Sequence, residues 1–199
     1  MQAPPASRYW CFGLVAGGCL ACDLVSKWWV FAALGGPGHS SRPLLRFNLL
    51  WGRFEFRLTT LLNQGALFGL GQGFGWLFAI LSLIAAGGIL YWLFVRAECS
   101  SWWLTVTLGL IFAGALGNLY DRLHLHGWKT PEGKSGVRDF LDCTIPGIQW
   151  AGLRPRLIRE YPWPVFNFAD VCLVTGSIML ALHSIRTPRK EPPGEPAAK

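Results

Sequence analysis

The stretch Gly73–Val95, GFGWLFAILSLIAAGGILYWLFV, decides the fold class, because its 23 residues include no charged side chain. A helix needs about 20 apolar residues to cross the roughly 30 Å hydrocarbon core of a bilayer. Lipid cannot satisfy exposed backbone N–H and C=O groups, so a run of this kind crosses as a helix. The sequence therefore predicts a transmembrane helix over 73–95.

Three further apolar runs lie on either side of this one. Residues 99–120 carry no charge and end at Asp121-Arg122, 9–34 contain Asp23 and Lys27, and 166–185 contain Asp170. We therefore predict an all-α membrane protein in which residues 1–199 form a single integral membrane domain with four transmembrane helices. A cleaved signal peptide is the alternative for 9–34, but Arg8 is the only charge before this run, and the run resumes after Lys27.

The composition agrees with a membrane protein. Of the 199 residues, 52% are hydrophobic and 15% are charged, against about 45–50% and about 25% in soluble domains. This excludes a soluble globular domain and a disordered chain. The net charge is +7, yet no Lys/Arg run or reading motif indicates nucleic-acid binding. Charge does not assign the orientation, because most basic residues lie on the side opposite the termini.

The predicted extramembrane segments are 35–72 and 123–165. In the first, Phe54, Phe56 and Leu58 alternate with charged residues, which predicts a small extramembrane β-sheet between the first and second helices. The second segment has no clear period. Residues 1–8 and 187–199 are short, polar and rich in proline, so we expect them to be disordered tails.

The polar residues of the spans converge on one end of the predicted bundle, opposite the termini, because successive spans alternate in direction. They are Asp23, Lys27, Asn63, Gln64, Asn118, Asp121, Arg122, Asn167 and Asp170. An ionisable group at membrane depth costs about 2.5–3.5 kcal/mol even on the lenient insertion scale. A cluster of such groups at one level is therefore a candidate functional site.

Six members of this cluster also have a purely structural interpretation. Asp23 and Lys27 have the i,i+4 spacing of a self-contained ion pair. Asp121 and Arg122 fit the end of a span at the membrane interface. Asn167 fits a helix N-cap, with Asp170 in the first turn. These interpretations stay open at this point.

Five short motifs occur in order along the chain: Asp23-x-x-Ser26-Lys27, Asn63-x-Gly65-Ala66-x-Phe68, Gly117-Asn118-x-x-Asp121-Arg122, Val137-x-Asp139-Phe140 and Phe166-Asn167-x-Ala169-Asp170. Together they resemble the motif set of bacterial lipoprotein signal peptidase (signal peptidase II). The resemblance extends from the first span to the last.

The resemblance implies an aspartyl endopeptidase of the bacterial inner membrane that removes the signal peptide from diacylglyceryl-modified prolipoproteins, just before the lipidated cysteine. It implies cytoplasmic termini and a site near the outer face. It assigns catalysis to Asp139 and Asp170, and substrate binding or site shaping to Asp23, Lys27, Asn63, Gly65, Asn118, Arg122 and Asn167. Two carboxyls that share a proton can activate a water molecule, so we expect no metal and no cofactor. The expected partners are lipid-modified prolipoproteins and membrane lipids, and the expected state is a monomer.

The chain departs from that pattern in three places. Its connections over 123–136 and 143–165 are longer than usual, Arg138 stands where an apolar residue is commoner, and Asp142 is a second carboxylate close to Asp139. Two other classes of protein remain open. A proton- or cation-coupled transporter also places carboxylates in a helical bundle, usually at mid-depth, and a non-enzymatic membrane scaffold would tolerate Asn at both Asp positions.

Overall fold

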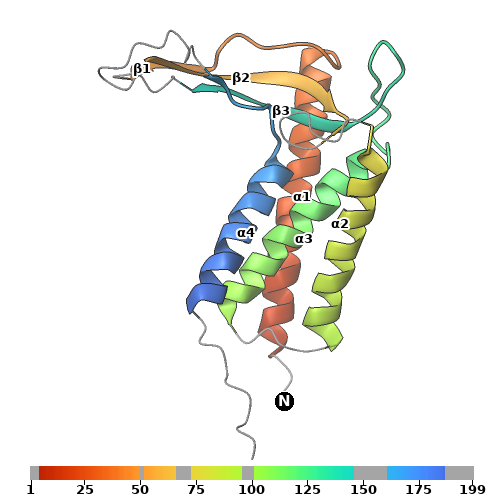
Figure 1. Ribbon diagram of the computed structural model, residues 1–199, viewed down its shortest axis with the longest axis vertical. Coiled ribbons are helices and arrows are strands. Elements are labelled where there is room, and N and C mark those ends of the chain that lie inside the picture. Colours follow the sequence, from red (N-terminus) through yellow and green to blue (C-terminus); the bar gives the residue numbers. More distant parts are fainter. Residues whose placement is uncertain (1–4, 50–51, 66–72, 96–100, 146–160, 187–199) are drawn as a thin grey trace, which may run out of the picture.

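The computed structural model describes residues 5–49, 52–65, 73–95, 101–145 and 161–186. Its helices are α1 (Ala6–Leu34), α2 (Gly75–Leu90) with the π-helical turn η2 (Tyr91–Val95), α3 (Trp102–Arg122) and α4 (Phe168–Arg186). They run side by side as one bundle (Figure 1). Among the described residues, four helices, counting α2 with η2 as one, are long and apolar enough to cross a membrane, with mean hydropathies between 1.4 and 2.2.

Helix α3 is the centre of the bundle and packs against each of the other three helices. The most hydrophobic window of α3 is 61% buried, whereas each of the other three is 17% buried. Glycines allow α4 to approach α3 closely. A Cβ at Gly114 would lie 2.5 Å from the carbonyl oxygen of Ala169, and one at Gly176 would lie 2.6 Å from the Ile111 side chain. Small residues at such crossings increase van der Waals contact between helices.

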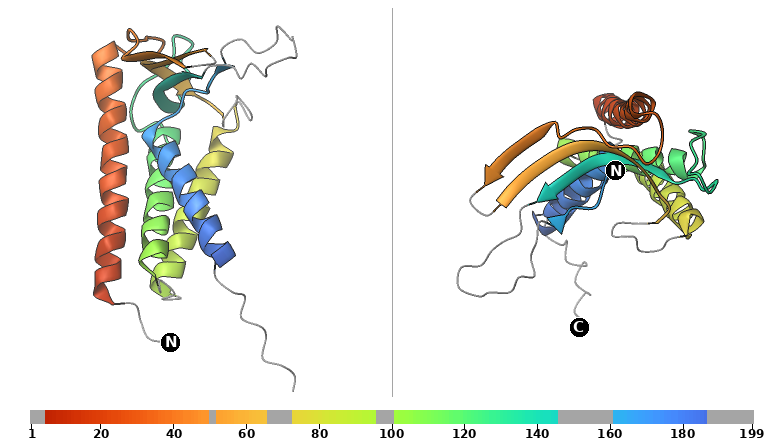
Figure 2. Two further views of the ribbon diagram at one scale, coloured as in Figure 1. Left: turned by 90° about the vertical axis from the view of Figure 1, so that its left-hand side faces the viewer. Right: turned by 90° about the horizontal axis from the view of Figure 1, so that it is seen from above.

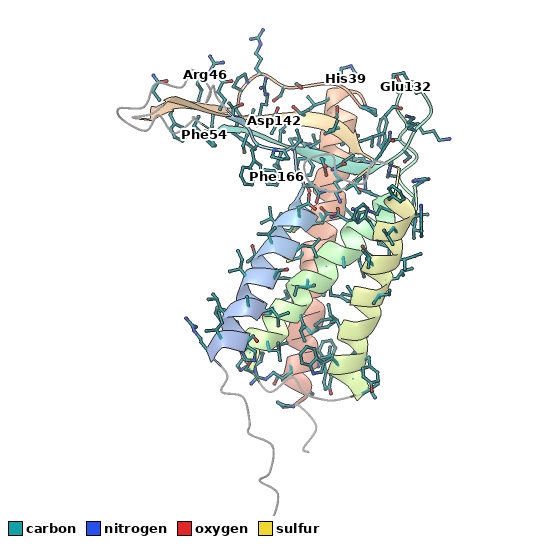
Figure 3. The ribbon with its side chains drawn as sticks, in the orientation of Figure 1. His39, Arg46, Phe54, Glu132, Asp142 and Phe166 are labelled. Carbon is teal, nitrogen blue, oxygen red and sulfur yellow. The ribbon has the colours of Figure 1, made fainter. Side chains whose placement is uncertain are left out.

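An antiparallel sheet covers one end of the bundle (Figures 1 and 2). It consists of β1 (Leu45–Leu49), β2 (Gly52–Asn63), β3 (Val137–Ile145) and the two-residue β4 (Tyr161–Pro162), in the order β1-β2-β3-β4. The hairpin of β1 and β2 projects sideways beyond the helices (Figure 2). Its two faces differ: Arg46 pairs with Glu55 at 2.8 Å on one face, and the rings of Phe47 and Phe54 stack at 4.8 Å on the other (Figure 3).

The predicted fold class is confirmed: the chain is a helical membrane protein with a small sheet. The prediction that the sheet belongs to the segment between the first and second helices was too narrow, because β3 and β4 come from 123–165. Strand β3 lacks a visible period because consecutive residues at its start, Val137 to Phe140, are all buried. A strand covered on both faces does not alternate between apolar and polar residues.

Two predictions about the ends of helices also change. Residues 1–8 were expected to be a disordered tail, but α1 begins at Ala6, so this expectation was wrong for Ala6–Arg8. Asp121 and Arg122 form the last turn of α3 rather than following it. The predicted disordered tail at 187–199 lies outside the described residues, as do Ala66 and Phe68 of the second motif.

Candidate active site

Asp139 lies in β3 on the face of the sheet that meets the helices. Its side chain is 2% exposed, and it pairs with Leu61 across an irregularity in β2 between Leu58 and Leu61. Successive side chains of a strand point to opposite faces, so Asp142, three residues later, points away from the bundle. There it forms an ion pair with Arg57 at 2.9 Å. The alternation of the strand thus separates the two carboxylates that the sequence left in competition.

Asp170 lies in the first turn of α4, and Asn167 precedes this helix. The backbone N–H of Asp170 donates to Oδ1 of Asn167 at 3.0 Å, and the backbone N–H of Asn167 donates to Oδ2 of Asp170 at 3.1 Å. This reciprocal arrangement is a capping box, which satisfies backbone donors that a helix start leaves open. The cap also fixes the position of the Asp170 carboxyl group.

Phe166, which lies between the sheet and α4 (Figure 3), brings the strand of Asp139 close to the start of this helix. Its backbone N–H donates to the carbonyl oxygen of Leu141 at 3.1 Å, and its carbonyl oxygen accepts from the N–H of Leu141 at 2.8 Å. These two bonds form a bridge between β3 and the residues before α4. As a result, Asn167 and Asp139 lie beside each other although they are 28 residues apart in the chain.

Two asparagine amides connect the two carboxyl groups, and a third binds Asp139 alone. Asn167 donates from Nδ2 to Oδ1 of Asp139 at 2.6 Å and to Oδ1 of Asn118 at 3.1 Å. Asn118 donates from its own Nδ2 to Oδ1 of Asp170 at 2.8 Å. Asn63, the last residue of β2, donates to Oδ2 of Asp139 at 2.9 Å. Asp139 is therefore held by two side-chain amides, and Asp170 by one side-chain amide and the backbone N–H of Asn167.

A second layer of buried charges lies beside these amides. Lys27 is 0% exposed and lies 2.7 Å from Asp23 and 3.1 Å from Asp121. It also donates to Oδ1 of Asn118 at 3.2 Å. Asp23 in turn accepts from the backbone N–H of Ala169 in α4 at 2.8 Å. Lys27 thus binds the oxygen of the Asn118 amide, whose N–H is presented to Asp170.

The two carboxyl groups share a small cavity. It has a volume of about 40 Å³ and is lined by Asn63, Gly65, Asn118, Arg122, Val137, Asp139, Val165 and Asp170. A site of this size and polarity has room for at least one water molecule. Burial raises the pKa of Asp139 to about 7, and the nearby charge of Asp170 acts in the same direction. A buried carboxyl group next to another one keeps its proton to a higher pH because the second negative charge is unfavourable.

The structure gathers all nine of the predicted site residues at one end of the bundle. Six of them line the cavity: Asn63, Gly65, Asn118, Arg122, Asp139 and Asp170. Asn167 joins the two carboxyl groups, and Asp23 and Lys27 lie in the buried layer. The self-contained ion pair is wrong for Asp23 and Lys27, because both also bind other helices. The N-cap interpretation of Asn167 is right, and the same residue also bonds to Asp139.

Sequence reasoning missed the part played by two residues, Asp121 and Arg138. Asp121 is 0% exposed rather than an interfacial end to the span, and it binds both Lys27 and Arg138. The available signal was the charge of Arg138 next to a candidate catalytic residue. Its partner lies 17 residues away in another element, which no local pattern reveals.

The fold and the site define a class: a four-helix membrane protein with two carboxyl groups facing one small polar cavity, beneath a sheet at one end of the helices. The family model for signal peptidase II matches residues 15–186. The chain therefore belongs to the signal peptidase II family.

Curated relatives and solved structures agree with this membership. The chain is 42% identical to the lipoprotein signal peptidase of Rhodopirellula baltica over 90% of this chain and 74% of the relative. It is 34% identical to that of Mycobacterium avium over 86% of this chain and 76% of the relative. A solved bacterial membrane enzyme aligns with a TM-score of 0.62 and 27% identity, covering 92% of this chain and 94% of that one. The chain is thus a multi-pass membrane protease of lipoprotein processing.

Proposed function

We propose that this chain is an aspartyl endopeptidase that cleaves lipid-modified prolipoproteins immediately before the lipidated cysteine, with Asp139 and Asp170 as its catalytic residues. The observation that carries the proposal is the shared cavity. Both carboxyl groups line it, and Asn167 and Asn118 link them through hydrogen bonds. The names of the relatives supply the substrate class.

The surroundings of the two carboxyl groups suggest how they divide the work. Asp170 accepts two N–H donors, from Asn118 and from the backbone of Asn167, and it lies at a helix N-terminus, which favours negative charge. Asp139 lies in a strand, and burial favours its protonated form. In the proposed resting state, Asp170 is ionised and Asp139 carries the proton.

Cleavage then follows as acid–base chemistry on one water molecule. Asp170 takes a proton from the water as its oxygen attacks the scissile carbonyl carbon, and Asp139 gives its proton to the carbonyl oxygen. A gem-diol forms. The proton on Asp170 passes to the amide nitrogen, the C–N bond breaks, and one gem-diol hydroxyl returns a proton to Asp139 as the new carboxyl group forms. Arg122 and Asn63, which line the cavity, are placed to bind carbonyl oxygens of the substrate.

The position of the site suits a lipid-bearing substrate. Most residues that line the cavity come from β2, β3 and the ends of α3 and α4, and these elements meet at the end of the bundle opposite the N-terminus of α1 (Figure 1). Water reaches a site at this level, while the acyl chains of the substrate stay in the bilayer. In the proposed orientation the termini are cytoplasmic and the sheet faces the outer side of the inner membrane.

The test is cleavage of a diacylglyceryl-modified prolipoprotein by purified protein in proteoliposomes, followed by gel shift. Asp139→Asn and Asp170→Asn should each abolish cleavage while the protein stays folded in the membrane. Asp142→Asn is the matched control, because Asp142 lies on the same strand but on the opposite face, paired with Arg57. Wild-type turnover in either of the first two variants would remove that residue from the proposed mechanism.

A further inference from the structure

Arg138 is a buried cation directly beside Asp139 in the chain. It is 3% exposed, and its guanidinium binds Oδ1 of Asp121 through two nitrogens, Nε at 2.9 Å and an Nη at 2.8 Å. Its backbone N–H donates to the other oxygen, Oδ2, at 2.9 Å. One residue of β3 thus binds both oxygens of a carboxylate in the last turn of α3.

These contacts close a ring of bonds around the site. Asp121 is bound by Lys27, Lys27 donates to Asn118, and Asn118 accepts from Asn167. Asn167 donates to Asp139, and Asp139 is joined to Arg138 by a peptide bond. The ring therefore connects β3 with α1, α3 and the cap of α4. Two of its connections attach the beginning of β3 to the bundle: the Arg138–Asp121 contact and the hydrogen bond from Asn167 to Asp139.

Buried charges of opposite sign are also paired around Asp121. Asp121 faces Lys27 on one side and Arg138 on the other, while Asp23 shares Lys27. Two buried carboxylates thus meet two buried cations. Without Arg138 the pair Asp23 and Asp121 would depend on Lys27 alone, and a buried charge that loses its partner is costly. Arg138 thus holds the start of β3, the strand that carries Asp139, both through its hydrogen bonds and through its charge.

We propose that Arg138 is a positioning residue for the cleavage reaction. Its two guanidinium bonds to Asp121 hold β3 against the end of α3 and so keep the Asp139 carboxyl group facing the cavity. The inference rests on the proposed function. Arginine suits this place because its planar guanidinium brings two N–H donors, Nε and an Nη, to one carboxylate oxygen at once, whereas lysine offers one point charge. A misplacement of about 1 Å at a catalytic group costs up to about 100-fold in rate.

The experiment measures kcat and KM for cleavage of the diacylglyceryl-modified prolipoprotein, per folded molecule, well below the melting temperature. Arg138→Met removes both guanidinium bonds to Asp121 and the positive charge, whereas Arg138→Lys keeps the charge but lacks the guanidinium group. We expect kcat to fall about 10- to 100-fold in Arg138→Met with KM within about twofold, and Arg138→Lys to lie between this variant and wild type. Arg57→Met is the matched control, since it breaks the Arg57–Asp142 pair on the outer face of the same two strands, and it should keep wild-type kcat.

The possible outcomes distinguish a failure of this inference from a failure of the proposed function. If Asp139→Asn is inactive and Arg138→Met keeps the kcat of wild type, the positioning role is wrong and the proposed function stands. If Asp139→Asn itself remains active, the proposed function fails. Should Arg138→Met not fold, Arg138→Lys decides: reduced kcat at unchanged KM supports the role, and wild-type kcat overturns it. A purely structural role would lower the melting temperature and leave kcat per folded molecule unchanged.

Discussion

Asn167 and Asp170 cap each other: each backbone N–H donates to the other's side chain, at 3.0 and 3.1 Å. The same Asn167 donates its side-chain amide to Asp139 at 2.6 Å. The start of α4 therefore serves two purposes at once. It satisfies the first turn of the helix, and it holds one candidate catalytic residue in the helix and the other in the strand.

Substitution at Asn167 should separate these two purposes. Ser caps helices about as well as Asn, whereas Ala costs about 1 kcal/mol, but neither side chain reaches Asp139. We expect Asn167→Ser, which keeps the cap, to lower the melting temperature less than Asn167→Ala does, while both lose about 10-fold or more in turnover because both lack the amide bonded to Asp139. Thermal unfolding in detergent and prolipoprotein cleavage measure the two effects. Wild-type turnover in Asn167→Ser would contradict the bridging role.

Asp139 should make the stability of the protein depend on pH. Burial raises its pKa from 3.8 to about 7 in the folded protein, so between these values the folded state binds more protons than the unfolded state. Stability from this group is therefore greatest at low pH and falls as pH rises from about 4 to 7. Asp139→Asn should remove this loss and melt at a higher temperature than wild type at pH 8.

The check is the melting temperature of both proteins between pH 4 and pH 8, with Asp142→Asn as the control. Asp142 lies on the outer face of β3 beside Arg57, so its variant should follow wild type. Parallel curves for wild type and Asp139→Asn would show that the carboxyl group titrates without a raised pKa.

Loss of Lys27 should be severe because two carboxylates depend on it. Asp23 and Asp121 lie 2.7 and 3.1 Å from its Nζ, and breaking a buried ion pair from one side costs about 3–5 kcal/mol. Lys27→Met should destabilise the fold by this order, and the double variant Lys27→Met/Asp23→Asn should recover part of the loss. Chemical denaturation measures both. Lys129→Met, at an exposed position, should stay within about 0.5 kcal/mol of wild type. An effect of that small size at Lys27 would mean that the buried network contributes little.

Gly117 should not accept a methyl group. A Cβ there would contact the Asp23 carboxylate and lie 3.2 Å from the Cβ of Ala169, so Gly117→Ala pushes α1 and α4 away from α3. We expect a loss of about 1–3 kcal/mol, as for other overpacked sites, and a reduction in turnover because Asp170 directly follows Ala169. Gly87→Ala in α2 is the control, since no atom lies within 4 Å of its Cβ position. Equal melting temperatures for the two variants would contradict this account.

Much of the architecture could be predicted because each helix has a local cause. A run such as Gly73–Val95 needs no partner to indicate a span, since its length and lack of charge suffice. Asp139 and Asp170 were predicted as a pair from the motif set, although no local pattern places a loop carboxylate beside a helix cap. The sheet was predicted only in part. The alternation at Phe54 and Phe56 was visible in the sequence, whereas β3, buried on both faces at its start, showed none.

The sequence by itself determined that four runs are long and apolar enough to cross a membrane and that the polar residues gather at one end of them, because hydrocarbon thickness sets the length of a span and successive spans alternate in direction. The tertiary structure alone decided which of those residues meet. Asp121 binds Arg138, Asn118 binds Asp170, and Asn167 binds Asp139, all between elements far apart in the chain. Such contacts arise from helix packing and strand pairing, whose geometry depends on the whole fold and not on any local stretch.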